Sequence, residues 1–291
     1  MLILPLILGV IFPQGRVLAG SPYHLIRWAL CIMIFINVLQ IEWSDLRPRR
    51  EHWVLLAANI LMGLLPCGLL KILWPSSDMP SLAAFFTGIA PTAAASAVIV
   101  SLLNGQVGFT VTGFIITNIG IACALVFLLP LVTGNISMAF LIHVASSMIS
   151  VVFLPLLLAR IVRYFFPAIL RYMTQLKELS LIMWSFTLYI IAGIATCNIQ
   201  ENSDASVAML VGMAGIALVL CIINFSFGYF IGRPQRSREC SQLLGQKNTT
   251  FAIFVALEYS SGIAALSTVF YVLFHNLWNS FQLISARRKT G

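Results

Sequence analysis

The chain has 291 residues, of which 60% are hydrophobic and only 9% are charged, and its formal net charge is +8. A mean hydropathy of +0.97 excludes a soluble globular domain of this size and indicates a polytopic helical membrane protein. The positive charge does not indicate a nucleic-acid partner, because the basic residues flank loops and form no continuous patch. We therefore expect an all-α protein whose main partner is the lipid bilayer.

About 20 apolar residues cross a bilayer as an α-helix. By this measure the sequence predicts ten spans, at residues 2–19, 23–41, 52–73, 81–103, 107–133, 136–165, 179–196, 205–231, 240–258 and 262–285. The first span is weak because Gln14 and Arg16 fall inside it, so nine spans are the alternative.

The distribution of charged residues predicts the orientation of the chain. Basic residues gather after the even-numbered spans and in the tail: Arg47, Arg49, Arg50, Arg160, Arg163, Arg171, Lys177, Arg233, Arg236, Arg238, Arg287, Arg288 and Lys289. The opposite side carries Arg16 and Arg27 among its basic residues, together with Asp78, Glu201 and Asp204. Because positively charged loops stay in the cytoplasm, we expect both termini there, in a bacterial inner membrane.

The chain divides into two sets of five spans, residues 1–134 and 135–291. An odd number of spans per half gives the halves opposite orientations, as in inverted-repeat transporters. The fourth span of each half is interrupted, at residues 88–92 and at residues 245–248. Paired interruptions at matching positions predict a transporter binding site, and Pro91 and Gly245 are the residues that we expect to break the two helices.

At the first interruption, Pro91 removes a backbone donor and clashes with the preceding turn. Its fixed φ suits the start of a new half-helix near Thr92, whose N–H groups and partial positive charge would face an anion. The alternative is a proline kink with no ligand.

At the second interruption, Asn248, Thr249 and Thr250 add side-chain donors and acceptors. Their alternative role is hydrogen bonding to neighbouring helices or to their own backbone. Lys247 allows three interpretations, because a charge at this depth is costly and is usually retained for a function. It tethers the broken helices by donating to freed carbonyls, it pairs with an anionic substrate, or it titrates and couples transport to protons.

Further polar residues lie inside apolar spans. His275 and Asn276 are in the middle of the last predicted span, and His143 lies in the sixth. For each histidine, we expect an interhelical hydrogen bond more than a role as ligand or proton relay. Glu258 alone among the acidic residues lies against an apolar run.

Enzymatic and metal chemistry is not predicted. The six cysteines lie singly, without Cys-x-x-Cys spacing, so neither a metal site nor a disulfide is expected. The sequence has no His-Glu-x-x-His motif, no Gly-x-Ser-x-Gly motif, no phosphate-binding glycine loop and no pair of intramembrane aspartates. We therefore expect no catalytic residues, no metal and no cofactor, with sodium or a proton as a possible coupling ion.

At these residues the chain resembles the bile acid:sodium symporter family. The family's first crossing helix carries Pro-Gly-Gly-Thr-x-Ser-Asn and then Gly-Asp/Asn-Val-Ala-Leu-Ser, which correspond to residues 91–97 and 105–110. Its second crossing helix carries Glu-x-Gly-x-Gln-Asn, which falls on residues 243–248, and its last helix carries a His-Asn pair. The resemblance extends over nearly the whole chain in spacing and topology. It implies a core of spans three to five and eight to ten, and a panel of spans one, two, six and seven.

The residues that match this family are Pro91, Ser96, Gly105, Gly245, Asn248, His275 and Asn276. The resemblance implies that the regions around them line a substrate cavity near the crossing.

The family's sodium ligands are largely replaced. Ala97, Leu243 and Lys247 stand where the family has asparagine, an acidic residue and glutamine. Ser96 and Thr110 remain as hydroxyl ligands for a cation, which are too few for an oxygen-rich cage. A lysine ammonium at such a position would supply the positive charge permanently.

We therefore expect a secondary transporter that moves a small organic anion by alternating access around the crossing of spans four and nine. The expected substrate-binding residues are Thr92, Ser96, Lys247, Asn248, Thr249, His275 and Asn276. Bile acids, keto acids, pantoate-like acids and sulfonated metabolites all fit this class. The alternatives are a sodium-coupled symporter of organic anions or bile acids, and a non-transporting membrane binding protein or enzyme.

Overall fold

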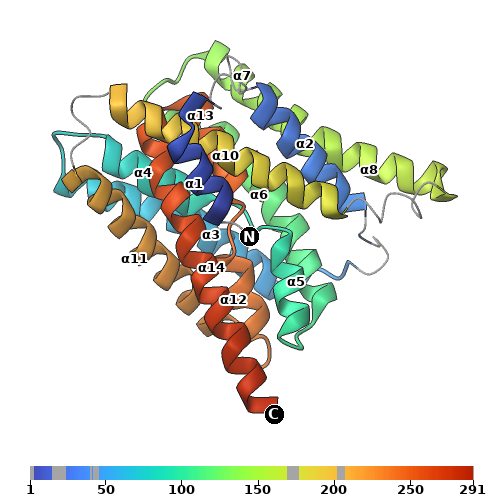
Figure 1. Ribbon diagram of the computed structural model, residues 1–291. Coiled ribbons are helices and arrows are strands. Elements are labelled where there is room, and N and C mark those ends of the chain that lie inside the picture. Colours follow the sequence, from blue (N-terminus) through green and yellow to red (C-terminus); the bar gives the residue numbers. More distant parts are fainter. Residues whose placement is uncertain are drawn as a thin grey trace. The chain divides into compact units, whose positions relative to one another are not determined.

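The structure is a computed structural model that describes residues 3–14, 24–39, 41, 46–168, 177–201 and 207–290. Arg16, Arg171 and Asp204, which contributed to the predicted orientation, lie outside the described residues. Within the described ranges all regular secondary structure is helical, as the composition predicts (Figure 1).

The helices are α1 (Ile3–Ile11), α2 (His24–Leu39), α3 (Arg50–Leu73), α4 (Met79–Ile89), α5 (Ala95–Leu102), α6 (Val107–Thr133), α7 (Met138–Met148), the π-helix η3 (Ile149–Phe153), α8 (Leu154–Phe165), α10 (Lys177–Glu201), α11 (Val207–Ile231), α12 (Ser237–Gly245), α13 (Thr249–Tyr259) and α14 (Gly262–Thr290). The predicted fourth and ninth spans each correspond to two helices, α4 with α5 and α12 with α13.

Several described helices are long and apolar enough to cross a membrane. By length and composition, four qualify: α3, α6, the continuous run of α7, η3 and α8, and α11. The run from α7 to α8 stays continuous although Pro155 lies near the start of α8. A proline inside a helix clashes with the carbonyl four residues earlier, and the wider π-turn of η3 lies where that clash is relieved.

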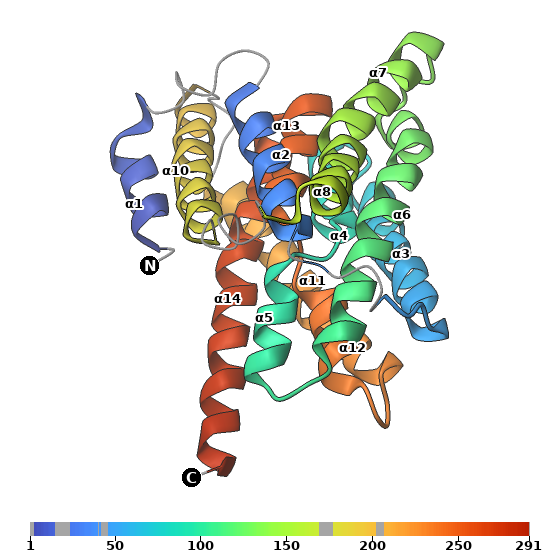
Figure 2. The same cartoon turned by 90° about the vertical axis from the view of Figure 1, so that its right-hand side faces the viewer.

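The chain forms two compact units, and boundaries between them fall inside α6, inside α13 and at the start of α14. The first unit comprises Met1–Glu42, Ala122–Ala205 and Phe254–Ile263. In it α1 lies along α10, as Figure 2 shows, and α2 packs against α8 and α10. A Cβ added at Gly9 would lie 2.3 Å from the Tyr189 carbonyl oxygen, so the α1–α10 contact requires a residue without a side chain.

The second unit comprises Trp43–Ile121, Ser206–Ile253 and Ala264–Gly291. Its helices α3 and α4 pack closely, as do α11 and α12, which lie side by side in Figure 1. A Cβ at Gly88 would lie 1.9 Å from the Met62 carbonyl oxygen, and one at Gly228 would lie 2.4 Å from that of Cys240. Small residues therefore let these backbones approach each other, which is the usual packing of helices in membranes.

A buried apolar cluster in the second unit joins α4, α11 and α14. Its members are Ala84, Ala217, Leu220, Cys221, Phe225 and Tyr271. This cluster holds α14 against the half-helices that carry the candidate site.

Candidate functional site

The interruptions at residues 88–92 and 245–248 lie between consecutive half-helices of the second unit. Helix α4 ends at Ile89 and α5 begins at Ala95, while α12 ends at Gly245 and α13 begins at Thr249. Each interruption therefore leaves carbonyl groups free at the end of one half-helix and N–H groups free at the start of the next.

The two interruptions pair through their backbones. The N–H of Ala93 donates to the carbonyl of Gln246 at 2.8 Å, and the N–H of Asn248 donates to the carbonyl of Pro91 at 2.6 Å. Backbone groups buried away from water must find partners. Here each broken helix supplies partners for the other, so the two extended segments cross in antiparallel directions.

Thr92 lies at the centre of the crossing, where it forms an isolated antiparallel bridge with Lys247. Its hydroxyl donates to the carbonyl of Leu243, and its own carbonyl accepts from the side-chain amide of Asn118 in α6 at 2.9 Å. The Thr92 side chain is fully buried. The residue predicted to contact substrate therefore also joins α6 and α12 to the crossing.

Lys247 is buried, with 1% of its surface exposed. Its Nζ donates to the carbonyl oxygen of Gly88 at 2.8 Å and to the side-chain oxygen of Asn59 in α3. The amide nitrogen of Asn59 in turn donates to the carbonyl of Ala90 at 3.1 Å. Lys247 and Asn59 thus satisfy two carbonyl groups freed at the end of α4.

The electrostatics of this position favour a cation. The C-terminal end of a helix carries partial negative charge, and the Lys247 ammonium lies against the last turn of α4. Within the described part of the chain, the ion pairs involve other residues and no carboxylate pairs with Lys247. The described partners of its Nζ are therefore two neutral oxygens, the Gly88 carbonyl and the Asn59 side-chain oxygen.

Gly245 lies at the end of α12 against the ring of Phe225 in α11. A Cβ added there would be 2.4 Å from two ring carbons, so this close approach requires glycine. The hydroxyl of Tyr271 in α14 donates to the Gly245 carbonyl at 2.8 Å. Tyr271 of α14 therefore satisfies a carbonyl group at the end of α12, just as Lys247 satisfies one at the end of α4.

A chain of buried amides extends this contact along α14. The side-chain nitrogen of Gln242 donates to the oxygens of Asn279 at 3.0 Å and Gln282 at 2.7 Å. The nitrogen of Asn279 donates to the side-chain oxygen of Gln246. Amide pairs of this kind join α14 to both α12 and the crossing, and they restrict how α14 can move relative to them.

Asn248 and Thr249 begin α13. The side-chain oxygen of Asn248 accepts from the N–H of Phe251 at 3.2 Å, which is the usual role of asparagine at a helix start. Thr249 is buried, and its N–H donates to the Lys247 carbonyl at 3.0 Å. These contacts agree with the interpretation in which the polar residues bond to their own backbone.

The predicted cation ligands Ser96 and Thr110 are both buried but are not joined by a hydrogen bond. The Thr110 hydroxyl donates to the carbonyl of Gln106 at 3.2 Å, one turn earlier in the chain. The Ser96 hydroxyl has no hydrogen-bond partner among the described residues. Ser96 therefore holds an unused donor and acceptor in α5, five residues after Pro91.

His275 and Asn276 differ in their surroundings. His275 is buried, its ring contacts Tyr271 edge to face with 5.5 Å between ring centroids, and neither ring nitrogen has a hydrogen-bond partner in the described ranges. The amide nitrogen of Asn276 donates to Val272 in its own helix at 2.7 Å. Tyr271 therefore connects His275 with the crossing, whereas Asn276 bonds along α14.

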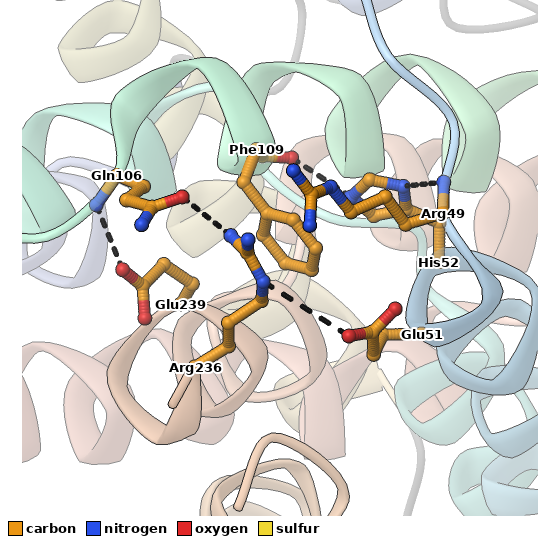
Figure 3. A network of polar contacts seen from close by, with 7 residues as sticks. All are labelled: Arg49, Glu51, His52, Gln106, Phe109, Arg236 and Glu239. Carbon is orange, nitrogen blue, oxygen red and sulfur yellow. Dashed lines mark hydrogen bonds and ion pairs between the residues drawn. The ribbon is translucent and has the colours of Figure 1, made fainter. Parts of the chain in front are cut away.

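Figure 3 shows a second polar network, at the N-terminal ends of α3, α6 and α12. The Glu239 carboxylate accepts from the N–H of Gln106 at 2.7 Å, directly before α6 begins. The guanidinium of Arg236 donates to the Gln106 side-chain oxygen, lies 3.9 Å from a Glu51 oxygen, and covers the ring of Phe109 at 4.5 Å. A carboxylate at a helix start is stabilising, so this network ties the three helix ends together.

His52 completes this network as a neutral imidazole. Its Nδ1 accepts from the N–H of Arg49 at 3.0 Å, so its Nε2 carries the proton and donates to the Phe109 carbonyl at 3.0 Å. The rings of His52 and Phe109 also lie 4.1 Å apart. The start of α3 is therefore fixed to α6.

Sequence reasoning did not select several of the residues that build these contacts. They are Asn59, Asn118, Tyr271, Gln242, Gln246, Asn279, Arg236 and Glu239. The available signal was the presence of amides and hydroxyls inside apolar spans, where polar side chains need partners.

The described residues contain no group of three or more histidines, cysteines, aspartates or glutamates that could hold a metal ion.

No protein-family model matches the chain, and no curated protein matches it in sequence.

Proposed function

We propose that the protein is a secondary transporter of a small organic anion that works by alternating access and is similar to bile acid:sodium symporters. The observation that carries this proposal is the crossing of two broken helices with a buried lysine between them. In inverted-repeat transporters, substrate and coupling ions bind where discontinuous helices meet near the bilayer midplane.

The architecture that we propose has ten spans in two inverted halves, residues 1–134 and 135–291, with both termini in the cytoplasm of a bacterial cell. Two features support it. Most helices follow the predicted span ranges, although α1 (Ile3–Ile11) covers only about half of the predicted first span, and the broken helices occupy the fourth position of each half. In addition, the second compact unit holds α3, α4, α5, α11, α12 and α14, which are core helices in the family that the chain resembles.

The charge of the crossing supports an anionic substrate. Lys247 has a positive charge that no described carboxylate neutralises. The starts of α5 and α13 add partial positive charges beside it. We propose that Thr92, Ser96, Asn248, Thr249, His275 and Asn276 surround the bound anion, with Ser96 and His275 offering unused polar groups.

The same geometry supports transport without sodium. Freed carbonyls at half-helix ends coordinate the coupling cation in transporters of this architecture. Here the Gly88 carbonyl accepts from the Lys247 ammonium. We propose that this ammonium replaces the coupling cation as a fixed charge, so that the carrier is a uniporter, an exchanger or a proton-coupled transporter.

A thermal-shift screen of purified protein tests the substrate class. Taurocholate, pyruvate, pantoate and isethionate represent the four candidate chemistries, and each is added in sodium-containing and sodium-free buffer. We expect at least one anion to raise the Tm of the wild type equally in both buffers. Counterflow of that anion in proteoliposomes then separates a carrier from a binding protein, because binding without counterflow contradicts transport.

A further inference from the structure

A histidine and a glutamate form a titratable pair in the first unit. The Nε2 of His143 in α7 lies 3.4 Å from a carboxylate oxygen of Glu258 in α13. The Glu258 side chain is 5% exposed, whereas that of His143 is 54% exposed. The second carboxylate oxygen of Glu258 is buried and has no hydrogen-bond partner among the described residues.

Tyr259 lies beside this pair, and the charge of Arg27 acts on Tyr259. The ring of Tyr259 contacts that of His143, with 5.7 Å between centroids. Arg27 of α2 donates to Ser150, and its charge and that of Glu258 both act on the Tyr259 hydroxyl. Among the described residues, His143 pairs with Glu258, while Glu258 and Arg27 both act on Tyr259.

The chemistry of the pair suits reversible proton binding. A proton can reside on the carboxyl group of Glu258, leaving the imidazole neutral, or on His143, leaving an ion pair. The imidazole lies at the protein surface, where it can take up or release a proton, and the buried carboxyl can hold one away from that surface. A buried acidic group in an apolar span is costly, so it is usually retained for a function. Proton relays are among the known functions of such groups.

We propose that Glu258 is a proton-binding site that couples transport to a proton gradient, with His143 as its route to water. This inference rests on the proposed transport function and assigns the coupling ion to it. One proton enters through His143, is held on Glu258 during the transition, and leaves on the other side of the membrane. Lys247 then remains a fixed charge, because its ammonium already donates to Gly88 and Asn59.

Proteoliposomes separate coupling from substrate movement. Radiolabelled taurocholate, pyruvate and pantoate are measured in two assays with wild type, Glu258→Gln and the control Asp78→Asn. The first assay is counterflow at equal pH, and the second is accumulation driven by a proton gradient, with protein-free liposomes as the blank. Asp78 is a suitable control because it is an exposed acid beside Lys71.

We expect the wild type and Asp78→Asn to accumulate substrate several-fold when the outside is acidic. Glu258→Gln should retain counterflow and lose this accumulation, because glutamine cannot exchange a proton. Accumulation by Glu258→Gln equal to that of the wild type would overturn the inference, and so would a wild type that counterflows but ignores the proton gradient. Absence of counterflow in the wild type would instead overturn the transport function itself.

His143→Gln provides a second test at an exposed position where folding is less at risk. We expect it to retain counterflow at equal pH and to lose several-fold in the rate of proton-driven accumulation. An unchanged rate would contradict the role of His143 as the route to water.

Discussion

Lys247 donates from its Nζ to the carbonyl oxygen of Gly88 at 2.8 Å, so the end of one broken helix is closed by a cation from the other. The two residues are 159 positions apart in the chain. The contact places the Lys247 side-chain nitrogen at the partially negative end of α4. It satisfies a carbonyl group that the break has freed.

Removal of this ammonium should destabilise the protein. Two hydrogen bonds from a charged donor are worth about 3–6 kcal/mol. Placing a lysine in the membrane costs about 2.5–3.5 kcal/mol, so the mid-range values give Lys247→Met a net loss of about 1.5 kcal/mol, within a span of about −0.5 to 3.5 kcal/mol. A thermal-unfolding series should show a Tm lower by a few degrees.

Lys71→Met is the matched control, because Lys71 is 63% exposed and lies 3.7 Å from Asp78. An exposed ion pair contributes about 0–1 kcal/mol, so its Tm should barely move. A Tm for Lys247→Met equal to or above that of the wild type would show that desolvation outweighs the two hydrogen bonds.

Because the end of α12 is closely packed, a single methyl group added at Gly245 should lower the stability of the protein. Gly245→Ala should cost about 1–3 kcal/mol because its Cβ would overlap the ring of Phe225. Gly212→Ala in α11 meets no atom within 4 Å and serves as the control. Thermal unfolding should separate the two variants, and Phe225→Leu should partly restore Gly245→Ala. Equal Tm values for the two alanine variants would contradict this packing.

The Ser96→Ala variant tests whether the Ser96 hydroxyl has a structural role or binds substrate. Its hydroxyl has no partner in the described part of the chain, so Ser96→Ala should change the free energy of unfolding by less than about 0.5 kcal/mol. If it contacts the anion, the thermal shift caused by that anion should shrink by several-fold. Unchanged ligand stabilisation would remove Ser96 from the proposed site.

The network at the start of α6 predicts a difference between two acidic residues. Glu239→Ala leaves the N–H of Gln106 without its acceptor and should cost about 0.5–2 kcal/mol, as loss of a helix cap does. Glu51→Ala should cost less, because Glu51 is partly exposed and lies 3.9 Å from Arg236. Thermal unfolding that ranks Glu51→Ala as the more damaging variant would contradict this account of the network.

The helices and their interruptions could be predicted from the sequence because their causes are local. Long apolar runs predict helices, and Pro91 lies where a helix must end because it lacks an N–H group. Gly245 and the amides after it mark the second break for a related reason. The observed helix ends at Ile89 and Gly245 fall at these residues.

The partners of the freed backbone groups could not be predicted, because they come from distant parts of the chain. Asn59 and Tyr271 lie in uninterrupted helices whose composition resembles that of their neighbours. The packing of the helices brings Asn59 to Lys247 and Tyr271 to Gly245. The contacts of Lys247 with Gly88 and Asn59 fit the tethering role, which is one of the three interpretations that the sequence allows.

In the proposed function, the Lys247 ammonium replaces the coupling cation, so uptake of the anion should not depend on sodium. The most direct measurement is uptake of radiolabelled taurocholate, pyruvate and pantoate into proteoliposomes, with sodium or choline outside, by wild type and Lys247→Gln. We expect the wild type to take up at least one anion at the same rate in both media, and Lys247→Gln to lose this uptake in both. Wild-type uptake driven by the sodium gradient, and unaltered in Lys247→Gln, would contradict it.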